Sequence, residues 1–219
     1  EEIPHVAKKC MDAFWPGPLT LVMKAKPGVL APSVTAGLST VGMRMPDHPV
    51  ALQLLRTLKK PLAAPSANRS GKPSPTKAAH VAEDLNGIIP YIVDGGTTGI
   101  GIESTVLDVT HEPPVILRPG GVTREMLEKV IGTVIEPTHA EQKIESTPKA
   151  PGMKYTHYAP EAPVYLIDET ANIELAVTAL QQQGHKVALL APRTYAHSVA
   201  DYFFTFGDEH DQYQMGANL

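Results

Sequence analysis

Four polar segments of the sequence combine hydroxyl groups, glycines and arginines, and each adjoins a short apolar run. They are residues 39–44, 64–76, 99–105 and 117–121. Such segments can present hydroxyls, backbone N–H groups or a guanidinium at the end of a strand. These donors suit phosphate and carboxylate groups, because a backbone N–H can approach an anion closely and arginine donates two parallel hydrogen bonds. The pattern indicates anion binding, and it leaves open the commoner role of Ser, Thr and Gly as turn residues.

Several catalytic signatures are absent from the sequence. Gly71-Lys72 resembles a P-loop only superficially, since Pro73 stands where that motif needs Ser or Thr and Ser66 stands at its first glycine. Residues 94–101 are rich in glycine, but not in the order of the dinucleotide-binding fingerprint. The sequence has no G-x-S-x-G or H-E-x-x-H motif, and its 9 histidines are scattered. These absences argue against a Walker-type nucleotide site, a classical hydrolase and a zinc enzyme.

The composition is ordinary for a globular protein, with 42% hydrophobic and 19% charged residues. A net charge of −4 gives no broad basic field, which argues against indiscriminate nucleic-acid binding. Cys10 is the single cysteine, so no intrachain disulfide can form and a reducing cytoplasm is the expected location. No apolar run approaches the roughly 18 residues that a membrane-spanning helix needs.

Periodicity and capping residues predict short helices and strands joined by shaped loops. Helices are expected over residues 4–14, 49–58, 76–85 and 123–131, strands over residues 19–25, 40–45, 88–93, 104–109 and 115–117, and a buried apolar segment over residues 62–64. Val50, Leu54, Leu55 and Leu58 would form the apolar face of the second helix, while Thr76 and Thr123 would cap the third and fourth.

Periodicity is lost over residues 136–160, where Pro, Thr, Lys and Glu accumulate, as is typical of an interdomain linker. It returns as a strand at residues 164–167, a helix at about residues 171–182 and a strand at residues 187–191. This β-α-β order predicts a small parallel α/β unit.

Five motifs together resemble the YrdC/Sua5 family of threonylcarbamoyl-AMP synthases. They are FWPGPLTLV at residues 14–22, STVGMRMP at 39–46, PLAAPSANRSGKPSPT at 61–76, GIESTVLD at 101–108 and ILRPGG at 116–121. APGMKYTHYAP at residues 150–160 is similar to the linker of the longer Sua5 type. The resemblance implies an α/β fold with a YrdC-like twisted mixed β-sheet and flanking helices. The expected domains are residues 1–136 (catalytic), 137–160 (linker) and 161–219 (part of a Rossmann-like C-terminal domain).

The resemblance also implies a reaction. L-Threonine and bicarbonate or CO2 form N-carboxythreonine, whose carboxylate attacks the α-phosphate of ATP, with Mg²⁺ sharing the charge. Pyrophosphate leaves, and threonylcarbamoyl-AMP passes to the tRNA threonylcarbamoyl transferase complex for t6A synthesis at adenosine 37. No protein nucleophile is needed, which fits a site built from Ser, Thr, Arg and backbone groups.

Residue roles follow from the same resemblance. Ser66 and Asn68 form the family's Ser-x-Asn pair, expected to be catalytic. The expected ATP-binding residues are Thr40, Ser66, Ser74, Arg118 and Tyr155, and the expected threonine-binding residues are Arg44, Ala64 and Ser104. His157, with Tyr155, would fold over the nucleotide as a lid. Lys72 could meet phosphate or could be a solvated loop charge, and no metal-ligating residue is assigned.

Two alternatives remain at this level: an RNA-binding or ribosome-associated module of the same fold, and a carbamoyl transferase relative. The negative charge and the scarcity of aromatic residues, 5% of the chain, weaken the case for tRNA binding. The family's Lys-x-Arg element would precede Glu1, so the chain is expected to be an inactive fragment that lacks its first strands and stops within the second domain.

Overall fold

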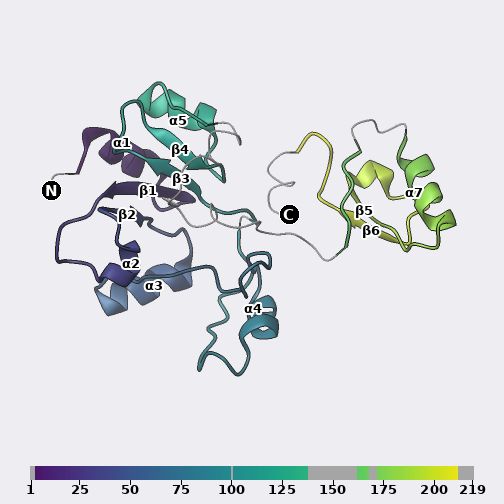
Figure 1. Ribbon diagram of the computed structural model, residues 1–219, viewed down its shortest axis with the longest axis horizontal. Helices are drawn as coiled ribbons and strands as arrows, with labels where there is room; N and C mark the ends of the chain where they lie inside the picture. The colour runs from purple at the N-terminus through teal and green to yellow at the C-terminus, as the bar shows by residue number, and fades with distance from the viewer. Residues whose placement is uncertain (1–2, 100, 138–161, 168–171, 212–219) are drawn as a thin grey trace. The chain divides into compact units, whose positions relative to one another are not determined.

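The computed structural model describes residues 3–99, 101–137, 162–167 and 172–211. The chain divides into two compact units (Figure 1). One unit comprises Glu1–Gly96 with Glu103–Tyr158, and the other comprises Thr97–Ile102 with Ala159–Leu219.

The first unit contains a mixed sheet and the predicted helices. Its elements are α1 (His5–Phe14), β1 (Leu19–Lys24), α2 (Pro32–Thr35), β2 (Thr40–Met43), α3 (Pro49–Leu58), α4 (Ala78–Leu85), β3 (Thr105–Asp108), β4 (Val115–Arg118) and α5 (Arg124–Ile131). The strand order is β2-β1-β3-β4. β1 runs parallel to β3, whereas β2 is antiparallel to β1 and β4 is antiparallel to β3. The predicted mixed α/β sheet is confirmed.

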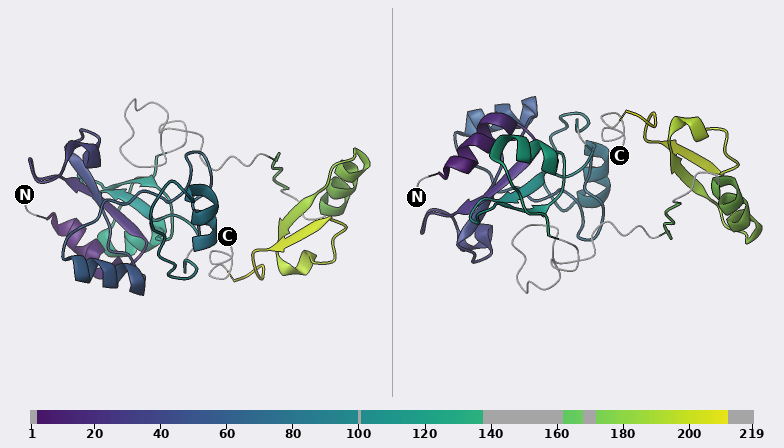
Figure 2. Two further views of the ribbon diagram at one scale, coloured as in Figure 1. Left: turned by 90° about the horizontal axis from the view of Figure 1, so that it is seen from below. Right: turned by 90° about the horizontal axis from the view of Figure 1, so that it is seen from above.

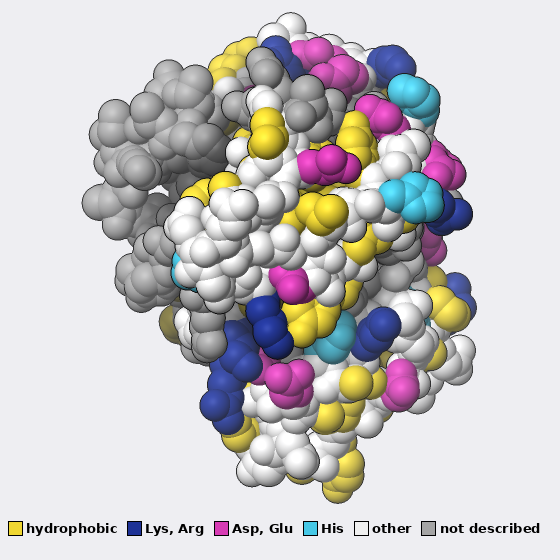
Figure 3. Space-filling view, turned by 90° about the vertical axis from the view of Figure 1, so that its right-hand side faces the viewer, with side chains coloured by type: hydrophobic (Ala, Val, Ile, Leu, Met, Phe, Trp, Pro, Cys, Tyr) yellow, Lys and Arg dark blue, Asp and Glu magenta, His cyan; other side chains and the backbone are white. Residues whose placement is uncertain are grey.

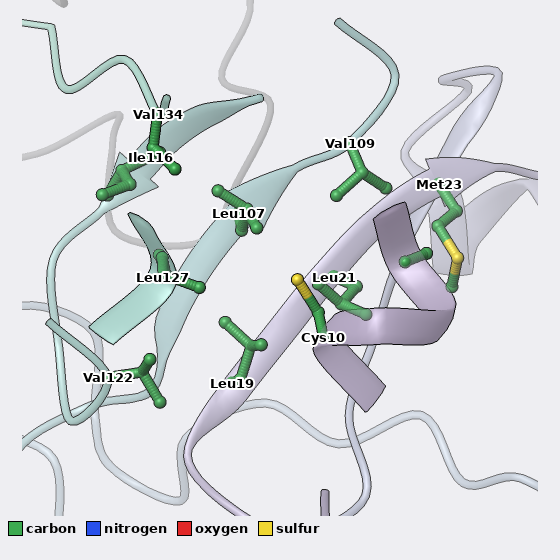
Figure 4. Close-up of a cluster of buried hydrophobic side chains, with 11 residues drawn as sticks. Cys10, Leu19, Leu21, Met23, Leu107, Val109, Ile116, Val122, Leu127 and Val134 are labelled. Atoms are coloured by element: carbon green, nitrogen blue, oxygen red, sulfur yellow. The ribbon is translucent and has the colours of Figure 1, made fainter. Parts of the chain in front are cut away.

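One face of this sheet forms the core with α1 and α5, which lie side by side (Figures 1 and 2). The core side chains come from β1, β3 and β4, from α1 and α5, and from the segments that adjoin them: Ala7, Cys10, Leu19, Leu21, Met23, Leu107, Val109, Ile116, Val122, Leu127 and Val134 (Figure 4). Burying one such leucine stabilises the fold by about 1.5–3 kcal/mol. The predicted Thr123 cap is confirmed, because its side chain accepts a hydrogen bond from the backbone N–H of Met126.

The opposite face of the sheet carries polar residues around a small apolar cluster. Successive side chains of a strand point to opposite faces, so Thr20, Val22 and their cross-strand partners lie away from α1 and α5. Val22 pairs with Gly42, and Val106 pairs with Arg118. Val22, Val106 and Leu117 form the cluster. The sheet therefore separates an apolar core from a polar face.

Three apolar segments differ from the sequence prediction. Residues 62–64 are exposed rather than buried, and residues 88–93 form no strand, with Tyr91 85% and Val93 75% exposed. On α3 three of the expected inner residues, Val50, Leu54 and Leu58, are exposed, whereas Leu55 is half-buried. A strand needs a hydrogen-bonded neighbour, and within the described ranges no strand pairs with residues 88–93. Helix α4 begins at Ala78, and Lys77 rather than the predicted Thr76 occupies its N-cap position.

The second unit is a small parallel α/β arrangement. It contains α7 (Ile173–Gln182), β5 (Ala188–Ala191), the 3₁₀ turn η2 (Arg193–Tyr195) and β6 (Tyr202–Thr205). β5 and β6 pair in parallel, and Ile173, Val177, Leu189 and Ala191 form the core. The predicted strand at residues 164–167 is wrong, and β6 was not predicted.

None of the helices within the described ranges is long and apolar enough to cross a membrane. On the face drawn in Figure 3, Lys and Arg side chains mix with Asp, Glu and hydrophobic side chains. No single sign of charge dominates that face.

Candidate anion-binding site at one edge of the sheet

The strand directions bring four polar residues of the first unit to one edge of the sheet. Because β1 and β3 are parallel and β2 and β4 run against them, this edge collects the starts of β1 and β3 and the ends of β2 and β4. Thr20 lies near the start of β1 and Ser104 directly precedes β3. Arg118 ends β4, and Arg44 directly follows β2. The predicted residues Arg44, Ser104 and Arg118 are thus gathered from distant parts of the sequence.

A chain of hydrogen bonds links Thr20, Ser104 and Arg118. The Oγ atoms of Thr20 and Ser104 lie 2.8 Å apart. The Arg118 guanidinium donates to the Ser104 carbonyl oxygen, at 2.9 Å from Nη2 and 3.2 Å from Nε, and Nη2 also donates to Ser104 Oγ at 3.2 Å. Ser104 is buried, with 6% of its surface exposed. Its hydroxyl is therefore held in place before any ligand binds.

Arg44 supplies a second guanidinium near Arg118. Although the residue as a whole is exposed, partial burial of its charged group lowers the pKa of Arg44, and the like charge of Arg118 lowers it further. Arg44 has no hydrogen-bond or ion-pair partner within the described part of the chain. A partly desolvated arginine without a carboxylate beside it is a group that an anion would stabilise. The charge of Arg118 is close enough to affect the pKa of Arg44, and two neighbouring positive charges at this edge indicate a carboxylate or phosphate site.

Gly120 allows the turn after β4 to pack against Ser104. A Cβ atom at Gly120 would clash with the carbonyl oxygen of Glu103 and lie 2.5 Å from the backbone nitrogen of Thr105. The Thr105 hydroxyl donates to the Val122 carbonyl at 2.6 Å, and the Val122 N–H donates back to that hydroxyl oxygen at 3.0 Å. Arg118 and Ser104 thus sit on two backbones that are fastened together.

Gly42 has no side chain to cover Thr20 on the neighbouring strand. A Cβ atom there would lie 3.3 Å from Thr20 Cγ2, which is tighter than an ordinary van der Waals contact. The glycine therefore leaves the surface beside Thr20 accessible, between Thr40 and Arg44.

Ser74 connects the polar loop to the sheet edge. Its hydroxyl donates to Glu103 Oε1 at 2.9 Å, and Glu103 is the neighbour of Ser104. The structure thus brings the predicted ATP contact Ser74 against the residue that precedes the predicted threonine contact Ser104.

The other predicted loop residues lie on an irregular, mostly exposed segment. Ala64 and Ser66 are exposed, and neither side chain bonds to another described residue. Asn68 Nδ2 donates to the carbonyl oxygens of Arg69 and Lys72, at 2.8 and 2.9 Å. Lys72 pairs with Asp84, with Nζ 2.7 Å from Oδ1. The Lys72 ammonium is thus paired with a carboxylate of α4, which differs from both roles expected for it, a phosphate contact and a solvated loop charge.

The predicted ATP contact Thr40 is not gathered with this group. Thr40 pairs with Lys24 at the other end of β2, and the four residue steps from Thr40 to Arg44 span roughly 13 Å of extended chain. Tyr155 and His157 lie outside the described residues.

Sequence reasoning missed Thr20, Glu103 and Asp84. Thr20 could have been noticed as a polar residue inside the apolar run of residues 19–23. Asp84 is an acid beside Val81 and Leu85 on α4, where an apolar residue would be expected. Glu103 carried no local signal.

Comparisons with known proteins decide the family. A family model for Sua5, YciO and YrdC proteins, described as telomere recombination, matches residues 1–120, more than half of the 219-residue chain. The chain belongs to the Sua5/YciO/YrdC family. A second model, the C-terminal domain of threonylcarbamoyl-AMP synthase, matches residues 122–219 of this Sua5/YciO/YrdC chain. The family membership predicted from the five motifs is confirmed.

Curated relatives and a solved structure agree with this assignment. This chain is 52% identical over 209 residues to the threonylcarbamoyl-AMP synthase of Bacillus subtilis (strain 168), and the match covers 93% of this chain and 59% of the relative. It is 48% identical over 214 residues to the threonylcarbamoyl-AMP synthase of Pyrococcus abyssi, covering 95% of the chain and 62% of the relative. A crystal structure of P. abyssi Sua5 complexed with L-threonine matches with a TM-score of 0.88 at 46% identity, covering all of this chain and 64% of that one. The chain spans about three fifths of the length of these relatives.

Proposed function

We propose that this protein is an L-threonylcarbamoyladenylate synthase. It makes threonylcarbamoyl-AMP and pyrophosphate from L-threonine, bicarbonate or CO2 and ATP, for the t6A37 modification of tRNA. The observation that carries the proposal is the pair of guanidinium groups, Arg44 and Arg118, beside the hydroxyls of Thr20 and Ser104. A relative with 46% identity crystallises with L-threonine, which supports an amino-acid carboxylate as one of the anions.

Arg44 is the proposed partner of the threonine carboxylate. It is the guanidinium at this edge whose side chain bonds to no other described residue, whereas Arg118 bonds to Ser104. Ser104 and the backbone of Ala64 would line the threonine pocket. Thr20 would hold the Ser104 hydroxyl in position.

The ATP phosphates are assigned to the loop and to Arg118. Ser66 and Asn68 are the proposed catalytic pair, and Ser74 and Thr40 are proposed phosphate contacts. Because Ser74 already bonds to Glu103, this loop can carry phosphate close to the threonine pocket. Tyr155 and His157 are proposed to cover the nucleotide.

The chemistry needs alignment rather than a protein nucleophile. A carboxylate oxygen of N-carboxythreonine forms a bond to the α-phosphorus of ATP, and the bond from that phosphorus to the pyrophosphate oxygen breaks. Two anions must approach each other, so donors already directed at the place of charge reduce the barrier. Arg44 and Arg118 supply that charge without giving up a proton.

Mg²⁺ would share the charge of the phosphates. Magnesium is commonly held by one or two carboxylates together with substrate phosphates. Glu103 is the carboxylate that the structure sets beside Ser74, so the donor set fits such a site. In the described part of the chain no three His, Cys, Asp or Glu side chains form a metal cluster.

The organisation of the whole protein is part of the proposal. Residues 1–136 would be the catalytic domain, residues 137–160 the linker and residues 161–219 part of the C-terminal domain. The product would pass to the tRNA threonylcarbamoyl transferase complex in the cytoplasm.

The direct test is mass spectrometry of reactions catalysed by the full-length gene product. We expect threonylcarbamoyl-AMP and pyrophosphate only when ATP, L-threonine and bicarbonate are all present. Omitting any one of them should abolish the product. Tight tRNA binding without ATP or L-threonine binding would contradict the proposal and favour an RNA-binding module.

A further inference from the structure

Asp84 on α4 is a buried carboxylate outside the core of the sheet. Only 7% of the residue is exposed. A buried carboxylate is costly unless it is paired and hydrogen-bonded. The hydrogen-bond partners of Asp84 therefore indicate which part of the structure this residue stabilises.

Within the described part of the chain, the side-chain carboxylate of Asp84 bonds to the loop that contains Ser66 and Asn68, and so does its main-chain carbonyl. Lys72 Nζ lies 2.7 Å from Oδ1, and the backbone N–H of Arg69 donates to Oδ2 at 3.1 Å. Arg69 Nε donates to the main-chain carbonyl of Asp84 at 2.9 Å. That carbonyl lies in the last turn of α4, where backbone acceptors lack helical partners. One residue thus receives three hydrogen bonds from the loop.

The loop between these contacts is closed by Asn68. Its Nδ2 donates to the carbonyl oxygens of Arg69 and Lys72, and the Lys72 N–H donates to the Arg69 carbonyl at 3.0 Å. Residues 68–72 therefore form a compact turn that is fastened to α4 at Arg69 and Lys72. Farther along, Ser74 fastens the same loop to Glu103.

The positive charge of Lys72 is paired with the carboxylate of Asp84. The Lys72 hydrogen bond, followed by that of the Arg69 backbone, lowers the pKa of Asp84, and the pKa of Lys72 is raised in return. Lys72, whose role the sequence left open, is therefore held away from a phosphate role. The turn would therefore offer a nucleotide its shape, its backbone donors and the side chain of Asn68 rather than the charge of Lys72.

We propose that Asp84 is a positioning residue, which sets the conformation of the nucleotide-facing loop by anchoring Arg69 and Lys72. This inference rests on the proposed function. Asp84 touches no substrate; it holds the turn that presents Ser66 and Asn68.

A graded series of variants tests the proposal by calorimetry with ATP and, separately, with L-threonine. Asp84→Ala removes every side-chain contact and should weaken ATP binding about tenfold, because a hydrogen-bonded charge is lost. Asp84→Asn keeps one acceptor for the Arg69 N–H, and Lys72→Met removes only the ion pair, so each should weaken ATP binding about threefold. Binding of L-threonine should change less than about twofold in all three variants, since the sheet edge holds that pocket. Glu83→Gln removes the same charge from the neighbouring, exposed position and should change neither affinity.

Hydrogen exchange supplies the structural readout. The amide of Arg69 should exchange at least about tenfold faster in Asp84→Ala than in the unsubstituted chain, and Asp84→Asn should restore most of the protection. Combining Lys72→Met with Asp84→Asn should weaken ATP binding no more than Asp84→Asn alone, because both remove the same ion pair.

Each other outcome overturns a defined part of the account. ATP binding that is unchanged by Asp84→Ala would contradict the positioning role. Equal loss of ATP and L-threonine binding would mean that Asp84 supports the whole unit rather than the loop. A full-length gene product that binds no ATP would contradict the proposed function itself, and with it the nucleotide-facing role of the loop.

Discussion

At the sheet edge, Thr20, Ser104 and Arg118 stand on strands whose other faces form the apolar core. Residues 64–74, in contrast, form an irregular segment with few buried side chains. The first group is fixed by strand register and by the backbone contact at Gly120. The second group is fixed by side chains, chiefly Asp84 and Glu103.

This difference suggests a division of labour within the proposed site. Segments with few buried contacts open at low free-energy cost, whereas core strands open only near global unfolding. The edge is suited to a small ligand of fixed shape, such as an amino acid. The loop is suited to a larger ligand that must enter and leave, such as a nucleotide.

The largest expected effect separates the core from the loop. Leu107→Ala should lower the free energy of unfolding by about 3 kcal/mol, because it leaves a cavity beneath the site. The matched change Leu62→Ala should cost less than about 0.5 kcal/mol, since that leucine is 48% exposed. Denaturant unfolding followed by Trp15 fluorescence measures both, because this single tryptophan packs against the core. Equal costs would remove the distinction between the two regions.

Gly120→Ala tests the backbone contact at the edge. The added methyl group must displace the backbone of residues 103–105, so we expect a loss of about 2 kcal/mol of stability together with weaker L-threonine binding. Gly99→Ala is the control, since nothing lies within 4 Å of a Cβ atom there. A Gly120 variant with normal stability and binding would show that the close approach does not position Ser104.

Thr20→Val tests the hydrogen bond that orients Ser104. Loss of one such bond should weaken L-threonine binding about fivefold, or about 1 kcal/mol, with ATP binding unaffected. Thr57→Val, on the exposed surface of α3, should leave both affinities unchanged. Calorimetry on the two variants compares them directly, and an unchanged threonine affinity in Thr20→Val would remove this residue from the site.

Thiol reactivity compares the burial of the core with that of the loop in the folded protein. Burial raises the pKa of Cys10 to about 11, because the thiolate would lose its hydration. Alkylation of Cys10 should therefore be slow even at about pH 9, where a thiol with the ordinary pKa of about 8.5 is mostly ionised, and should become fast on unfolding. In the variant Ser66→Cys, the introduced thiol should react readily in the folded protein, because that position is exposed. Similar rates at both positions would contradict the assigned burial.

Periodicity and caps predicted most strands and the described helices other than the short α2, because these elements depend on neighbouring residues. The apolar residues 88–93 predicted a strand, yet local composition cannot reveal whether another strand lies alongside. The candidate site was likewise predictable only where local sequence was sufficient. Family motifs identified Arg44, Ser104 and Arg118, but the convergence of these residues depends on strand order. Thr20 and Asp84 were missed, because their roles arise from contacts with residues far along the chain.

The central claim is that Arg44 at the sheet edge binds the carboxylate of L-threonine. Calorimetric titration of L-threonine into the unsubstituted chain, Arg44→Ala and Arg56→Ala tests it most directly. Arg56 lies on α3 and is exposed, so its replacement controls for loss of one positive charge. We expect Arg44→Ala to weaken L-threonine binding at least about tenfold and Arg56→Ala to leave it unchanged. Equal binding by all three proteins would contradict the account.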